Sequence, residues 1–267
     1  MFTCVFGSYI KYNFHVGFAV LALAQISALD FGINLPFIHQ LIFFVAPFLG
    51  YNFIKFHLFY WRAKFFQSDK LKLLLGFFLL ITLILGRIIF FLPLFSQGLF
   101  FFTLLLVLLY CLPLPGFNIN FRGFRGLKIH LVALSWVLMT VFLPLSLEGK
   151  LVTEFSITYG LQRYFYVIVA TLPFEIRDLK SDHPNLSTWP QILGIKTTKI
   201  LGLIMLIIFL FLEILCRFSS RFEIIVLIAI LLTVFILISK KQQPKYFSSF
   251  WVEGIPILWL FLKYIML

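Results

Sequence analysis

The sequence predicts an all-α fold: a bundle of membrane-spanning helices that forms a single domain over residues 1–267. Hydrophobic residues make up 62% of the chain and charged residues only 12%, and the mean hydropathy is +1.05. These values exclude an ordinary water-soluble domain. The apolar residues also lie in long runs, whereas a membrane β-barrel would show short segments of alternating polarity.

The long apolar runs define the expected helices in order. A helix needs roughly 20 predominantly apolar residues to cross a bilayer, and the chain offers about nine such stretches. They are 5–29, 36–59, 71–94, 97–115, 127–147, 155–174, 197–216, 221–239 and 249–266. Pro113 and Pro115 weaken the end of the fourth stretch, because proline interrupts the helical hydrogen-bond ladder. We therefore expect a polytopic protein with about nine spans.

The basic residues predict how the chain is oriented. The net charge is +12, and the connections after the second, fourth, sixth and eighth stretches carry Arg62, Lys64, Lys70, Lys72, Arg122, Arg125, Lys128, Arg177, Lys180, Lys196, Lys199, Lys240, Lys241 and Lys245. The opposite connections carry only Lys150, Arg217 and Arg221. By the positive-inside rule, the basic side and the N-terminus are cytoplasmic. This distribution favours an integral protein of a bacterial inner membrane over a nucleic-acid-binding protein, and contact with anionic membrane lipid is its simplest role.

Residues 175–182, EIRDLKSD, form an acidic segment directly after the sixth apolar stretch. Asp178 and Asp182 are four positions apart, so on a helix both carboxylates would project from one face. Two such carboxylates repel each other unless a cation lies between them. The segment therefore predicts a hard divalent ion, Mg²⁺, next to an anionic substrate. The alternative is a helix end whose charges are simply solvated.

The wider segment 174–199, FEIRDLKSDHPNLSTWPQILGIKTTK, resembles the second aspartate-rich motif of the UbiA superfamily of intramembrane prenyltransferases. Members read Asp-Ile-Arg-Asp-x-x-x-Asp, followed by Thr-x-Pro-x-x-Leu-Gly and a Lys/Arg-Thr pair. Glu175 takes the first acidic place here, and the matching residues are Ile176, Arg177, Asp178, Asp182, Thr188, Pro190, Leu193, Gly194, Lys196 and Thr197.

The resemblance implies a UbiA-like helical bundle and a function. Asp178 and Asp182 would be Mg²⁺ ligands, supported by Glu175, and Arg177 and Lys180 would contact phosphate. The metal would make the diphosphate of a prenyl diphosphate a better leaving group. The prenyl chain would then pass to an apolar or aromatic acceptor.

The first motif of that family, Asn-x-x-x-Asp-x-x-x-Asp, has no acidic counterpart at the end of the second stretch. The best registers read Tyr51, Lys55, Phe59, or alternatively Asn52, Phe56, Tyr60. In the first register, Lys55 stands where the family has a metal-binding aspartate. We therefore expect Lys55, with His57, Arg62 and Lys64, to contact the substrate phosphates in place of one Mg²⁺. The alternative is that Lys55 extends from a helix end to the lipid headgroups.

Other charged residues are secondary candidates. Arg122, Arg125 and Lys128 follow the fourth stretch, where they would either contact the diphosphate or only fix the topology. Arg163 lies inside the sixth stretch, where a charge is costly unless it is paired or hydrated. It marks either a functional cavity or a buried structural pair.

Three functions remain open at this point. The favoured one is a membrane prenyltransferase, whose partners are a prenyl diphosphate, a lipophilic acceptor and membrane lipid. The second is a catalytically degenerate relative that binds polyprenyl phosphate or another lipid. The third is a transporter, which would also carry intramembrane charge.

Overall fold

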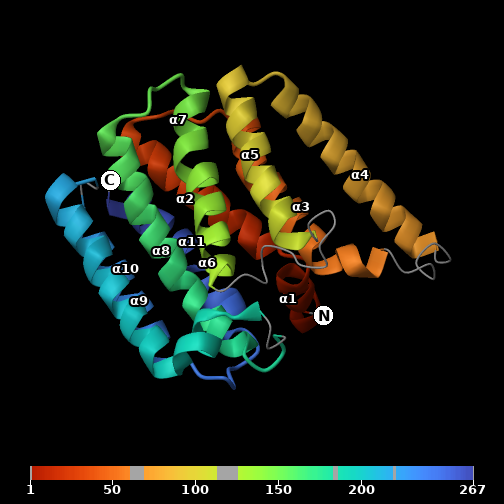
Figure 1. Ribbon diagram of the computed structural model, residues 1–267. Coiled ribbons are helices and arrows are strands. Elements are labelled where there is room, and N and C mark those ends of the chain that lie inside the picture. The colour runs from red at the N-terminus through yellow and green to blue at the C-terminus, as the bar shows by residue number, and fades with distance from the viewer. Residues whose placement is uncertain (1, 61–68, 113–125, 183–185, 219–220, 267) are drawn as a thin grey trace.

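The structure is a computed structural model that describes residues 2–60, 69–112, 126–182, 186–218 and 221–266. These residues form a helical bundle (Figure 1), which confirms the predicted all-α class. In chain order the helices are α1 (Phe2–Lys11), α2 (Phe14–Phe31), α3 (Phe37–Tyr60), α4 (Asp69–Phe90), α5 (Leu94–Cys111), α6 (Leu127–Val137), η3 (Leu138–Phe142), α7 (Leu143–Leu147), α8 (Glu154–Asp178), α9 (Trp189–Cys216), α10 (Phe222–Ile238), η5 (Phe247–Val252) and α11 (Ile255–Met266).

Each predicted apolar stretch corresponds to one helix or to consecutive joined helices. Within the described residues, six helical segments are long and apolar enough to cross a membrane: α2, α3, α5, α6 to α7, α9 and η5 to α11. The apolar parts of α4 and α10 are shorter. α8 is the most polar of the long helices, and it is the helix that carries the acidic segment. The N-terminal helix and the end of α11 lie at opposite ends of the bundle (Figure 1).

Local chemistry explains where the helices break. The first predicted stretch divides at Asn13, whose positive φ of 58° separates α1 from α2. Two spans contain wide π-helical turns, η3 and η5. Pro144 follows η3, and because proline has no N–H to donate to the carbonyl one turn earlier, the regular ladder cannot run through this point.

The core of the bundle lies around α8. This helix packs most extensively against α9 and also contacts α6. Gly202 on α9 allows the close approach, since a Cβ at this position would lie 2.5 Å from Leu172 Cδ1 of α8. α4 stands at the edge of the bundle (Figure 1). Its large exposed apolar side chains suit contact with lipid: Leu73, Phe77, Leu79, Leu80, Leu83, Ile84 and Phe90.

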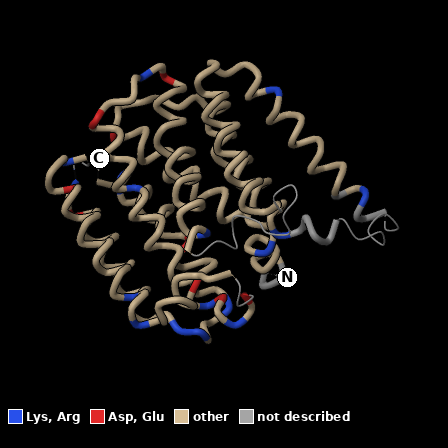
Figure 2. Tube along the Cα trace, in the orientation of Figure 1, with Lys and Arg blue, Asp and Glu red and all other residues tan. Residues whose placement is uncertain are grey.

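Many of the charged residues lie at one end of the bundle (Figure 2). This end holds the connection from α8 to α9 and the connection from α10 to η5. It is the end that the sequence assigns to the cytoplasm.

Candidate functional site

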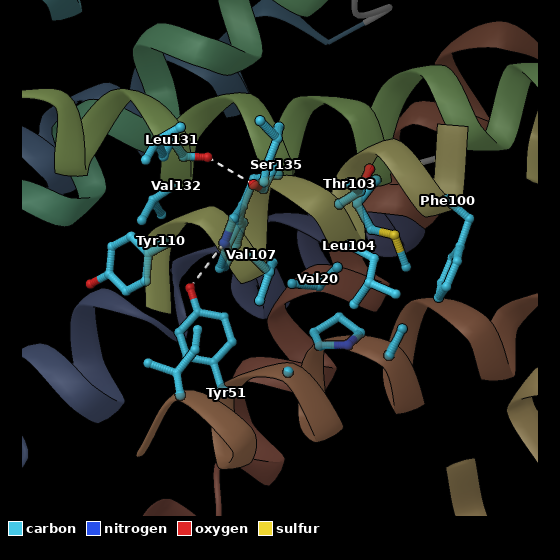
Figure 3. A pocket seen from close by; sticks show the side chains of 17 residues that line it. Val20, Tyr51, Phe100, Thr103, Leu104, Val107, Tyr110, Leu131, Val132 and Ser135 are labelled. Carbon is cyan, nitrogen blue, oxygen red and sulfur yellow. Dashed lines mark hydrogen bonds between the residues drawn. The ribbon is translucent and has the colours of Figure 1, made fainter. Parts of the chain in front are cut away.

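Two cavities adjoin inside the bundle. The apolar cavity, about 170 Å³, lies between α2, α3, α5 and α6, and its lining is almost entirely hydrocarbon and aromatic (Figure 3). The polar cavity, about 210 Å³, lies beside it between α3, α6, α8 and the start of α11. Both cavities share the lining residues Tyr51, Tyr110, Val132 and Trp136. Together they offer a hydrophobic space that continues into a charged one.

The shared wall is fixed by a hydrogen bond. Trp136 on α6 donates its indole N–H to the hydroxyl of Tyr51 on α3 at 3.0 Å, and Figure 3 shows Tyr51 pointing toward α6 from the opposite side of the apolar cavity. The contact ties α3 to α6 at the junction of the two cavities.

Four acidic or basic side chains line the polar cavity: Lys128, Glu175, Asp178 and Glu253. Lys128 lies in the first turn of α6. Glu175 and Asp178 lie in the last turn of α8. Glu253 lies directly after the π-helical turn η5 and lines the cavity. Residues far apart in the sequence therefore meet at the charged end of the bundle.

Lys128 joins two of the predicted acidic residues. Its Nζ lies 3.2 Å from Glu175 Oε1 and 3.0 Å from Asp182 Oδ2. All three side chains are largely buried, with 12%, 5% and 9% of their surfaces exposed. Glu175 also accepts a hydrogen bond from the backbone N–H of Trp189, the first residue of α9. The acidic segment is thus anchored to the starts of two other helices.

Asp178 has a different partner from Asp182. α8 ends at Asp178, and Asp182 lies in the turn that follows. Arg177 Nε lies 2.7 Å from Asp178 Oδ1, and the Arg177 guanidinium lies 5.1 Å from the centre of the Phe174 ring. Glu175 and Asp182 therefore share the ammonium group of Lys128, whereas Asp178 forms an ion pair with Arg177. The assignment of Asp178 and Asp182 as joint metal ligands stays a prediction.

The segment after the acidic residues shapes the start of α9. The side chain of Gln191 accepts the N–H of Thr188 at 2.9 Å, and Pro190 occupies the first turn, where its missing N–H costs nothing. Gly194 then takes φ 78° and ψ 161°, which breaks the helix into two parts. The Thr-x-Pro-x-x-Leu-Gly pattern thus encodes a capped turn and a kink beside Glu175.

The α3 residues that align with the first family motif form hydrogen bonds with backbone carbonyls. Asn52 is buried and donates to the carbonyls of Tyr12 at 2.8 Å and Phe48 at 2.7 Å. Lys55, one turn further along α3, donates to the carbonyl of Lys11 at 2.8 Å. Lys55 does not line either cavity described above, but it is close enough to Glu253 for an electrostatic interaction. Its contact with phosphate stays a prediction.

The remaining basic candidates differ in what the structure shows of them. Lys180 lies exposed in the turn after α8. Arg122 and Arg125 lie outside the described residues, as do Arg62 and Lys64. Among the secondary candidates that the structure describes, Lys128 is the one that lines the polar cavity.

Glu253 is a site residue that the sequence reasoning missed. Its carboxylate lines the polar cavity and interacts electrostatically with Arg177 and Lys55. An acidic residue inside an otherwise apolar span was the available signal, because intramembrane carboxylates mark functional sites. Because Glu253 is far from the acidic segment in sequence, the sequence alone did not indicate that both line one cavity.

Arg163 belongs to a separate buried network near the other end of the bundle. Its guanidinium donates to the hydroxyls of Tyr159 at 2.8 Å and Ser27 at 3.3 Å. Tyr159 in turn donates to Asp30 at 2.9 Å, and Asp30 forms an ion pair with Lys263 on α11. Of the two interpretations that the sequence allowed, the structure favours the buried structural network.

The donor set does not fit a metal ion held by the protein alone. Within the described residues, no group of three or more His, Cys, Asp or Glu side chains converges on one point. The two carboxylates that do converge already share the ammonium group of Lys128. Among the described residues, the predicted Mg²⁺ therefore has no site formed by protein ligands alone, and its binding stays a prediction.

The fold and the cavities together define a class of protein: a membrane-embedded helical bundle whose interior offers a hydrophobic space ending in charged groups. Two solved structures share this fold. One is a UbiA homolog from Archaeoglobus fulgidus bound to Cd²⁺, with a TM-score of 0.60 and 17% sequence identity over 94% of this chain and 98% of that chain. The other is a UbiA homolog from the same organism, with a TM-score of 0.54 and 16% identity over 96% and 95% of the two chains.

Comparison with protein-family models and with curated protein sequences gives no match. The likeness to the two solved structures covers nearly the whole chain, and it confirms the UbiA-like fold that the acidic motif predicted.

Proposed function

We propose that this protein is a membrane prenyltransferase that moves an isoprenoid chain from a prenyl diphosphate to an apolar or aromatic acceptor. The observation that carries the proposal is the pair of adjoining cavities. An isoprenoid chain matches the apolar cavity, and a diphosphate matches a neighbouring space that contains ionisable side chains and lies at the charged end of the bundle. A water-soluble substrate would not need the apolar cavity, and contact with lipid alone would not need the polar cavity.

The charged groups suit the chemistry of this transfer. The bond between the allylic carbon and the diphosphate oxygen breaks, and the diphosphate leaves with its electron pair. Lys128 and Arg177 are the cations closest to the acidic residues of the cavity, and positive charge there stabilises the departing oxygens. The acceptor forms the new bond to the allylic carbon and gives up a proton, for which Glu253 is the available carboxylate.

The test is release of pyrophosphate by the purified protein, given a prenyl diphosphate and a panel of lipophilic acceptors, with Mg²⁺ and with EDTA. Glu253→Gln removes the proposed base and should slow pyrophosphate release by about 100-fold or more, the usual contribution of a positioned acid or base. Asp178→Asn removes the carboxylate that pairs with Arg177 and should slow release as well. The matched control is Glu148→Gln, the same chemical change at an exposed position after α7. Equal rates for all three variants would contradict the proposal.

A second function has its own supporting observation. Lys128 forms ion pairs with two of the acidic residues, Glu175 and Asp182. Asn52 donates its amide hydrogens to backbone carbonyls. A protein of this kind could hold a polyprenyl phosphate without transferring the chain. Saturable binding of a prenyl diphosphate with no pyrophosphate release for any acceptor would favour this lipid-binding function over the enzyme.

A further inference from the structure

We propose that Lys128 is the resident cation of the polar cavity, and that the Glu175–Asp182 pair holds this ammonium group in place of a divalent metal. The part of the proposal that concerns the substrate rests on the proposed function: the anionic head group meets Lys128 directly and binds without Mg²⁺.

The geometry around Lys128 resembles that of a bound ion. Two carboxylate oxygens from different parts of the chain lie at 3.2 and 3.0 Å from one nitrogen. Both carboxylates are more than nine-tenths buried, so water screens their charges poorly. Without a cation between them they would repel each other. The ammonium supplies the charge that a metal would otherwise supply.

The position of Lys128 indicates that its carboxylate partners hold it there. The residue lies in the first turn of α6, where the helix dipole favours negative charge and disfavours a cation. A basic side chain at this point, mostly removed from water, needs stronger compensation than a solvated surface lysine. Glu175 and Asp182 provide it.

The rest of the cavity does not restore a metal site. Mg²⁺ is usually held by one or two carboxylates together with water and substrate phosphates, but the two carboxylates that converge here already contact the ammonium group of Lys128. Within the described part of the chain, no third His, Cys, Asp or Glu side chain joins them. On α3, Asn52 stands at the Asn position of the related first motif in the second register, and it donates both hydrogens of its amide group to backbone carbonyls. Lysine, in contrast, is a compact point charge with three donors that can serve two carboxylates and a phosphate at once.

The first experiment measures Mn²⁺ alone, by electron paramagnetic resonance, on the full-length protein in lipid nanodiscs. Lys128→Met should create a divalent-ion site, because it leaves two buried carboxylates facing each other. We expect Mn²⁺ to bind Lys128→Met at least about tenfold more tightly than the wild type, since a like charge no longer repels the ion. Lys128→Arg, which keeps the charge, should behave as the wild type does. Lys128→Met with Glu175→Gln should lose the gained site.

Mn²⁺ binding by the wild-type protein provides a second test. Tight Mn²⁺ binding by the wild type that Glu175→Gln or Asp182→Asn abolishes would overturn the proposal. Equal Mn²⁺ affinity of wild type and Lys128→Met, with both eluting as monodisperse protein, would overturn it as well.

The second experiment measures binding of farnesyl thiolodiphosphate, a non-hydrolysable prenyl diphosphate, in EDTA and in Mg²⁺. The two affinities should agree within about threefold, and Lys128→Met should weaken binding in EDTA by about tenfold or more, as loss of a charge-assisted contact does. A large loss of wild-type affinity in EDTA would refute metal-independent binding. If no prenyl diphosphate binds at all, the proposed function fails, and the Mn²⁺ comparison still decides the role of Lys128.

Discussion

Two buried networks in this protein join charged side chains from distant parts of the chain, and the two differ in their surroundings. At the cavity end, Lys128 serves two carboxylates that face an internal space. At the other end, Asp30 lies between Lys263 and the Tyr159–Arg163 pair. The second network is fully packed, and its role is to join α2, α8 and α11. Its removal should therefore affect stability before it affects any ligand.

Lys263→Met tests that structural role. The substitution leaves Asp30 buried without its ion-pair partner, which costs about 3–5 kcal/mol when one member of a buried pair is removed. We expect a clear fall in the apparent midpoint of thermal unfolding in detergent. Lys241→Met, at an exposed position, should leave the midpoint unchanged.

The double variant Lys263→Met with Asp30→Asn supplies the coupling measurement. Because the neutral amide no longer needs a cation, the double variant should be more stable than Lys263→Met alone. Additive losses from the two substitutions would show that the ion pair contributes no coupling.

At the scale of helices, deviations from regular geometry lie next to the polar cavity. η5 precedes Glu253, and the kink at Gly194 follows the residues that contact Glu175. These deviations have local causes. A regular helix through residue 194 would change the direction of α9 relative to the acidic segment. The kink therefore helps to set the position of the residues that contact Glu175.

Gly194→Ala tests this link. The combination of φ 78° and ψ 161° is accessible essentially to glycine alone, and forcing another residue into it costs about 1–3 kcal/mol. We expect a lower unfolding midpoint together with weaker binding of the prenyl ligand. The matched control is Gly98→Ala on α5, where a Cβ meets open space in an ordinary helical backbone. There alanine should be neutral or stabilising by up to about 1 kcal/mol. Equal effects at the two positions would rule out a special role for the kink.

The helices could be predicted from the sequence, whereas the site could be predicted only in part. Apolar length alone locates the spans, because the bilayer fixes how long each run must be. The break at Asn13 was missed because the count of apolar residues over 5–29 does not register a single residue with positive φ. For the site, Glu175, Asp178, Asp182 and Lys128 were each candidates from the sequence. Which carboxylate meets which cation depends on how α6 approaches α8, and a single sequence carries no information on that distance.

At the scale of the whole molecule, the separation of charge predicts orientation. The end that carries the polar cavity also carries the basic connections, and the positive-inside rule places it in the cytoplasm. A diphosphate made in the cytoplasm would then reach the cavity without crossing the membrane.

Cysteine labelling on intact cells tests the orientation. In a background without Cys4, Cys111 and Cys216, a cysteine at Glu148 should react with a membrane-impermeant maleimide, because the positive-inside rule predicts that this connection lies on the outer side. A cysteine at Lys241 should react only after permeabilisation. The reverse pattern would invert the topology and move the polar cavity to the outer face.

The apolar cavity has a consequence for kinetics. Its walls are helices α2, α3, α5 and α6, which are themselves immersed in the bilayer. Under the proposed function, both the prenyl donor and the lipophilic acceptor dissolve in that bilayer before they reach the protein. The concentration that governs turnover is then their mole fraction among the surrounding lipids, and adding inert lipid at constant total substrate should slow the reaction by dilution in two dimensions.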